Sequence, residues 1–71
     1  MITISSPIKQ DFIIELLDGK TYKDITFTFK GKAGMNLNFE VSTDDKDSAI
    51  AVAKKTIKST EIGAVLYFQV K

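Results

Sequence analysis

Apolar and polar residues change their spacing close to residue 44 of this chain. Over residues 44–58 the apolar positions recur at helical spacing, so one side is apolar and the other carries lysines. Acidic residues lie at the start of this segment and Lys54, Lys55 and Lys58 near its end, which complements the helix dipole. The pattern predicts the only helix of the chain. Its apolar stripe consists of Ala49, Ile50, Val52, Ala53, Thr56 and Ile57.

The remaining segments alternate with the two-residue period of β-strands. The second and third of them have one apolar and one polar face, whereas the first and last are apolar on both faces. Asp18-Gly19 between two apolar runs is a strong hairpin signal, and residues 31–34 supply a second turn with two glycines. The sequence therefore predicts four strands, over residues 10–17, 21–30, 35–42 and 62–70.

These elements predict a single α+β domain of two layers over residues 1–71. A four-stranded, mostly antiparallel sheet has the order β-β-β-α-β along the chain, and the helix covers one of its faces. The last predicted strand adds beside the first, giving the spatial order 4-1-2-3, or beside the third, giving 1-2-3-4. We prefer 4-1-2-3 because it joins the apolar outer residues of the first and last strands. Residues 1–7 form a loose terminus or a short edge strand, since Pro7 interrupts a strand.

Composition excludes several classes of protein. A chain of 71 residues without cysteine has no disulfide framework and no thiolate metal site, and it fits the cytoplasm better than an oxidising compartment. No segment has the roughly 20 apolar residues of a membrane span, and the short alternating N-terminus is not a signal peptide. The net charge is +1 and all ten basic residues are lysine, which disfavours bidentate recognition of phosphate or guanine.

The preferred strand order leaves an apolar patch on the sheet face opposite the helix. It consists of Ile13, Leu17, Val65 and Tyr67. Exposed apolar patches of this kind mark interaction surfaces. We therefore expect a protein-interaction module that forms a homodimer, or binds another protein, through this face. The alternative is that the N-terminal segment, with Ile2 and Ile4, folds over the patch.

A second hypothesis is weak binding of nucleic acid through a basic patch. The patch would combine lysines of the helix with two from the second predicted turn. The acidic residues on the same helix and the lack of an aromatic base-stacking platform count against it. The five residues concerned are Lys30, Lys32, Lys54, Lys55 and Lys58.

Catalysis and cofactor binding have little support in the sequence. There is neither histidine nor cysteine, so no side chain titrates near neutral pH in its ordinary state and no thiol nucleophile exists. Glu15, flanked by Ile13 and Leu17, is the one carboxylate in apolar surroundings that suggests a general acid or base. Residues 30–34 lack the following helix of a phosphate-binding loop, and residues 44–47 lack the spacing of a calcium loop. We therefore expect a protein that is not an enzyme, with no catalytic residue, metal or cofactor.

Overall fold

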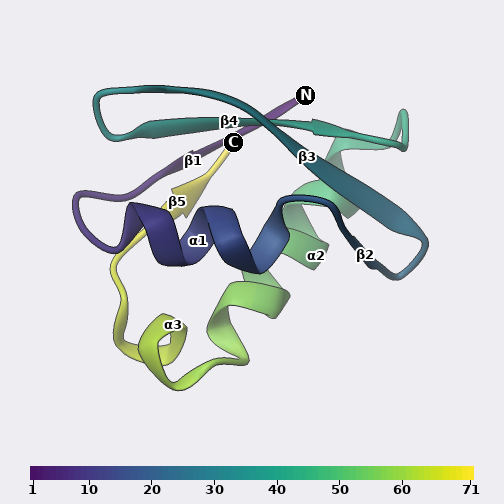
Figure 1. Cartoon of the computed structure of the whole chain (residues 1–71). Helices are drawn as coiled ribbons and strands as arrows, with labels where there is room; N and C mark the ends of the chain where they lie inside the picture. Colours follow the sequence, from purple (N-terminus) through teal and green to yellow (C-terminus); the bar gives the residue numbers. More distant parts are fainter.

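The computed structural model describes all 71 residues and consists of a five-stranded antiparallel sheet and three helices. The helices lie together on one side of the sheet (Figure 1). In the sheet the strands follow the order β2-β3-β4-β1-β5. The predicted α+β class is thus confirmed, but with one more strand and two more helices than expected. The elements are β1 (Ile2–Ser5), α1 (Gln10–Leu17), β2 (Lys20–Tyr22), β3 (Ile25–Ala33), β4 (Asn36–Val41), α2 (Lys46–Lys58), α3 (Glu61–Val65) and β5 (Gln69–Val70).

Helix α2 confirms the helix that the sequence predicts. Asp45 is its N-cap, and the carboxylate accepts a hydrogen bond of 3.1 Å from the backbone N–H of Ser48. Ala49, Ala53 and Ile57, spaced four residues apart, are fully buried against the sheet. Because two of these three residues are alanines, the helix can lie close to the strands it covers.

Residues 10–17 form α1, so the predicted first strand is wrong. Ile13 and Leu17 lie one helical turn apart and are both buried, while Asp11 and Glu15 are exposed. Gly19, with a φ of 73°, follows the end of this helix and donates a hydrogen bond to the carbonyl of Phe27. The turn predicted at residues 18–19 therefore exists, but it joins a helix to a strand.

The predicted strand over residues 21–30 is divided into β2 and β3. The division falls at Lys23 and Asp24, whose φ angles are 53° and 66°, between the paired residues Tyr22 and Ile25. Strand β3 then continues to Ala33, so the second turn is shorter than expected and lies at residues 34–35. Strand β4 confirms the predicted strand over residues 35–42, apart from its terminal residues.

The N-terminal segment is neither loose nor an edge strand, because β1 pairs with β4 on one side and β5 on the other. Ile2 and Ile4 are buried, and the backbone N–H of Ser6 continues the pairing with a hydrogen bond to the carbonyl of Met35. The predicted spatial order 4-1-2-3 is therefore wrong. The middle of the sheet is formed by β4 and β1, which are far apart in sequence.

The predicted last strand, over residues 62–70, is also wrong for most of its length. Residues 61–65 form α3, residues 66–68 are a connecting segment, and only Gln69 and Val70 form β5. The C-terminal segment thus joins the sheet only at Gln69 and Val70, where β5 adds to β1 as an edge strand.

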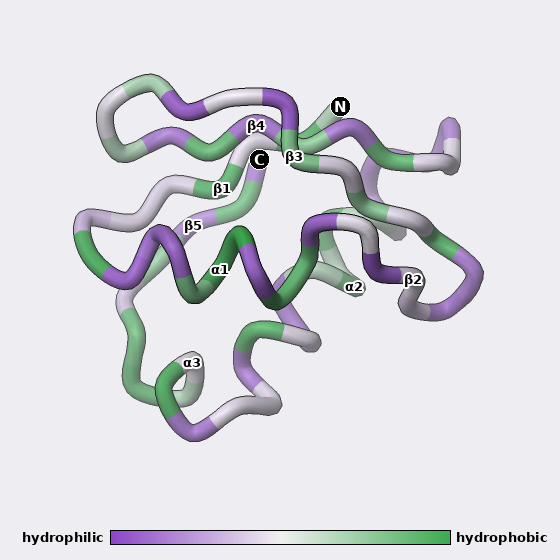
Figure 2. The backbone as a smooth tube through the Cα atoms, in the orientation of Figure 1, coloured by the Kyte–Doolittle hydropathy of each residue, from purple (hydrophilic) through white to green (hydrophobic).

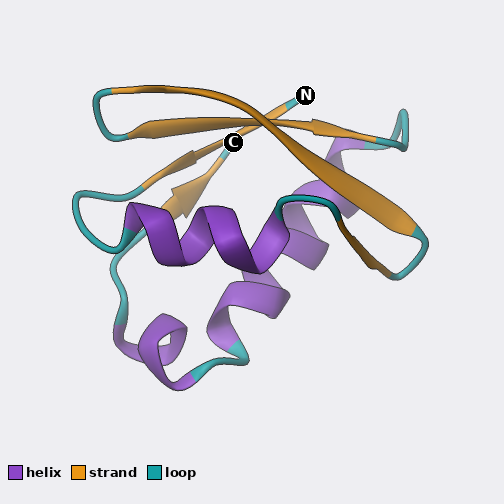
Figure 3. Cartoon of the chain, in the orientation of Figure 1, coloured by secondary structure: helices purple, strands orange, loops and turns teal.

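The two faces of the sheet differ in chemistry, and only one is covered by helices (Figure 3). On the open face polar side chains pair across the strands: Thr3 donates to Asn38 at 2.9 Å and Ser5 donates to Asn36 at 2.6 Å. The covered face and the helices form a single apolar core. It contains Ile2, Ile4, Ile13, Leu17, Ile25, Phe27, Leu37, Phe39, Ala49, Ala53, Ile57 and Val70.

Candidate functional site

The interaction face predicted from the sequence does not exist as one surface. Ile13 and Leu17 are fully buried in the core, whereas Val65 and Tyr67 are 87% and 74% exposed. The reason is the helical conformation of α1, which turns Ile13 and Leu17 together toward the sheet. None of the four side chains lies on the open face of the sheet, which is polar.

The exposure of Val65 follows from how α3 is held against α2. Thr60 is the N-cap of α3: its hydroxyl accepts from the N–H of Gly63 at 2.9 Å and donates to the carbonyl of Ile57 at 2.7 Å. Gly63 is buried against the last turns of α2. Because this glycine faces inward, Ile62 and Val65 are left on the outer side of the short helix, with 40% and 87% exposure.

The connecting segment after α3, residues 66–68, is apolar as well. Leu66 and Phe68 are half-buried and pack against the core, while Tyr67 between them is exposed. Figure 2 shows the hydrophobic stretch from α3 toward β5 at the border of the molecule. We call the exposed members of this stretch the C-terminal apolar cluster: Ile62, Val65 and Tyr67.

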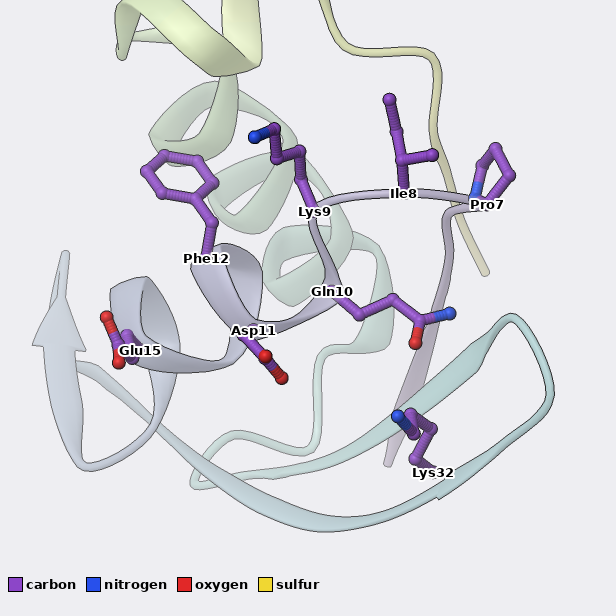
Figure 4. A pocket seen from close by; sticks show the side chains of 8 residues that line it. All are labelled: Pro7, Ile8, Lys9, Gln10, Asp11, Phe12, Glu15 and Lys32. Carbon is purple, nitrogen blue, oxygen red and sulfur yellow. The ribbon is translucent and has the colours of Figure 1, made fainter.

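A hollow of about 530 Å³ lies beside the N-terminal half of α1 (Figure 4). Its charges come from two acidic and two basic side chains, and Ile8, which is 60% exposed, lies at its border. The charged residues are Lys9, Asp11, Glu15 and Lys32. Glu15, the carboxylate suggested as a general acid or base, is exposed at the surface of α1. No three carboxylates or other metal-ligating side chains come together here or elsewhere in the protein. The hollow offers a charged surface without a nucleophile beside a base.

The five lysines of the predicted basic patch are not brought together. Lys54, Lys55 and Lys58 are exposed on α2. Lys30 lies on the open face of the sheet and forms a salt bridge of 3.3 Å with Glu40. Lys32 borders the hollow beside α1. The pleat of β3 and its irregularity between Phe29 and Gly31 direct these two lysines to different faces.

Two lysines that are not part of the predicted basic patch lie close to α2. Lys23, at the β2–β3 turn, borders a hollow of about 430 Å³ together with Lys55 and Tyr22. Lys71 borders a groove of about 360 Å³ together with Lys54 and Lys58. Only the strand pairing places these residues beside the helix, so no local signal could have indicated them. The helix therefore has basic surroundings on two sides.

The carboxyl of Asp45 has a lowered pKa. Hydrogen bonds from the Ser48 side chain and backbone lower the pKa of Asp45 from its ordinary value of 3.8. This carboxyl caps α2 and borders none of the hollows. Its shift therefore reflects helix capping and not an acid–base site.

Comparisons with family models, with curated proteins and with solved structures found no match for this chain. The longest helix, α2, has 13 residues, and none of the helices combines the length and apolar character needed to span a membrane.

Proposed function

We propose that this protein is a non-catalytic protein-interaction module of the cytoplasm that self-associates through the C-terminal apolar cluster. The observation that carries the proposal is the exposure of Val65 and Tyr67, two residues apart, at 87% and 74%. Of the four interaction residues expected from the sequence, only Val65 and Tyr67 remain in the proposed interface. Ile62, the third member of the cluster, is added to them. The open face of the sheet is a weaker candidate, because its Thr, Ser and Asn side chains already hydrogen-bond one another.

The size of the cluster sets the strength of association that we expect. An apolar side chain of this size contributes about 1.5–3 kcal/mol when fully buried. In a dimer with two-fold symmetry both copies would bury the same three side chains, so that six side chains contribute. Association itself costs about 4–15 kcal/mol. We therefore expect a weak dimer with a Kd in roughly the micromolar range or above.

Sedimentation equilibrium over a concentration series tests the proposal. We expect the wild-type protein to show a concentration-dependent increase in mass, and the double variant Val65→Ser/Tyr67→Ala to remain monomeric at the same concentrations. Both side chains are exposed, so the variant should keep the wild-type fold and circular dichroism spectrum.

Met35→Ser is the matched control, because Met35 is 54% exposed but lies at the β3–β4 turn outside the cluster. This variant should associate like the wild type. A wild-type chain that is monomeric at every concentration would exclude self-association, and equal association of the double variant would move the interface elsewhere.

The second candidate function is weak binding of nucleic acid by the lysines around α2. Its support is the position of Lys54, Lys55 and Lys58 on one helix with Lys23 and Lys71 on either side. Binding of this type weakens steeply with salt, because counterions are released from the phosphates. Amide chemical shifts of α2 that do not change with added oligonucleotide at low salt would exclude it.

A further inference from the structure

A groove of about 360 Å³ lies between α2 and the edge strand β5. Lys54 and Lys58 are four residues apart and therefore lie on the same side of α2, where they form one wall. The other wall is formed by the chain from Phe68 to Lys71, which includes β5. The groove thus runs between a helix and the border of the sheet.

Strand β5 has backbone hydrogen-bonding groups that no neighbouring strand occupies. Lys71 and Thr3 exchange both backbone hydrogen bonds, at 2.8 and 2.9 Å. In an antiparallel pair such residues alternate with residues that form no bond to the partner strand. Val70, which is opposite Ile4, therefore directs its N–H and C=O away from β1, and no strand follows β5 in the sheet. This is a free strand edge, which can accept another strand.

The charge of the groove decides which strand fits. Lys54, Lys58 and Lys71 are exposed, and the only salt bridge of the protein joins Lys30 to Glu40. A second copy of this edge would place lysines against lysines, which disfavours pairing of β5 with itself. An acidic segment would instead neutralise all three.

We propose that this groove binds an extended acidic peptide segment of a partner protein, which adds to β5 as a further strand of the sheet. The backbone of Val70 would supply main-chain hydrogen bonds, and Lys54 and Lys58 would contact the acidic side chains, as in other cases where a peptide lies between an edge strand and a helix. A nucleic-acid backbone would use the lysines but not the strand edge. The inference goes beyond self-association and uses a different surface from the C-terminal apolar cluster.

Amide hydrogen exchange of the full chain, with and without a blocked peptide of alternating aspartate and valine, tests the proposal. We expect the Val70 amide to exchange several-fold more slowly with saturating peptide, because its N–H would then donate to the peptide. The Lys71 amide, which already donates to Thr3, should change little and serves as the internal control.

Two further comparisons separate strand addition from charge attraction. The same peptide methylated at alternate backbone nitrogens keeps its charge but loses donors, so its affinity should fall about tenfold or more. The variant Lys54→Glu/Lys58→Glu should weaken the unmodified peptide by about tenfold or more, whereas Lys20→Glu, on the distant edge strand β2, should have little effect.

Equal binding of the methylated peptide, or an unchanged Val70 amide in the complex, would overturn strand addition. An oligonucleotide of equal charge that binds the same lysines more tightly than the peptide would also overturn it, in favour of nucleic acid. If no peptide binds while the wild-type chain still dimerises, this inference fails and the proposed self-association is unaffected.

Discussion

Gly63 illustrates how a single small residue determines the position of the candidate site. A Cβ atom built at this position would overlap the carbonyl oxygen of Ile57 and lie 2.6 Å from the hydroxyl of Thr60. The Ile57 carbonyl is backbone of the last turn of α2, and the Thr60 hydroxyl is held in place by hydrogen bonds to this carbonyl and to the N–H of Gly63. Only glycine therefore allows α3 to lie this close to α2, and this approach is what turns Val65 outward.

We predict that Gly63→Ala destabilises the protein by about 2 kcal/mol, because the added methyl group cannot be accommodated without moving backbone. Urea denaturation measures the loss. Gly31→Ala is the matched control: nothing lies within 4 Å of a Cβ at Gly31, so its effect should stay within roughly 0.5 kcal/mol. A Gly63→Ala protein as stable as the control would contradict the close packing of α3.

Asp45 determines the start of α2 and makes that start sensitive to acid. Its folded-state pKa lies below the ordinary value because the Ser48 hydrogen bonds favour the charged form. Such a group contributes stability that is fully present above its unfolded pKa, and this contribution is lost as the pH falls through the lower folded value.

We predict that Asp45→Ala lowers the melting temperature by a few degrees at pH 7 but by less at an acid pH below the lowered folded-state pKa, where the wild-type carboxyl has taken up its proton. Thermal denaturation followed by circular dichroism at the two pH values measures the difference. Asp44→Ala removes an exposed carboxylate that has no capping bond, and it should show no comparable dependence on pH. Equal effects of Asp45→Ala at both pH values would contradict the charged cap.

The turn of the β2–β3 hairpin has a backbone conformation that its two residues rarely adopt. It places both Lys23 and Asp24 at positive φ, a region that side chains with a Cβ rarely adopt. Turns of this kind favour Asn-Gly. We predict that Lys23→Asn/Asp24→Gly stabilises the protein by about 1 kcal/mol, as measured by urea denaturation. Asp24→Ala leaves a Cβ at the same φ and should give no gain; if it stabilises equally, removal of the charge and not relief of backbone strain is the cause.

The same elements show why the sequence predicted some segments correctly and others wrongly. Helix α2 has 13 residues with charged termini and a clear apolar stripe, so its pattern has one interpretation. Helix α1 has eight residues, most of them apolar, and its alternation fits a strand as well as a helix. The burial of Ile13 and Leu17 together requires helical spacing, and only the fold reveals that. For this reason Ile13 and Leu17, two of the four residues of the predicted interaction face, are buried.

The C-terminal segment was misread for a different reason. Residues 62–70 alternate in hydrophobicity, but the contact of Gly63 with α2 selects a helix for the first part of the segment. This contact joins two elements and leaves no local signal in the pattern. Val65 and Tyr67 are exposed, but they belong to α3 and the segment after it and not to the outer sheet face on which the alternation places them.

At the scale of the whole molecule, the sheet depends on β1. This strand joins β4 to β5, so it pairs the N-terminus with residues near position 38 and with the C-terminus. Pairings between distant segments cannot be read from the alternation of one segment, which is why the spatial order was wrong. A four-residue strand between two others also has to be well packed on its inner face, and Ile2 and Ile4 are almost completely buried there.

We therefore predict that Ile4→Ala costs about 2–5 kcal/mol, since it leaves a cavity at the centre of the core. A domain of this length has a total stability of roughly 4–10 kcal/mol, so the variant should be partly unfolded at 37 °C. Thr3→Ala changes the neighbouring residue, which lies on the open face. It removes one hydrogen bond, to Asn38, and should lower the free energy of unfolding by about 1 kcal/mol. Urea denaturation of both variants compares the two faces of one strand. Equal losses would mean that β1 is held by its backbone pairing alone, and the central role of its inner face would be refuted.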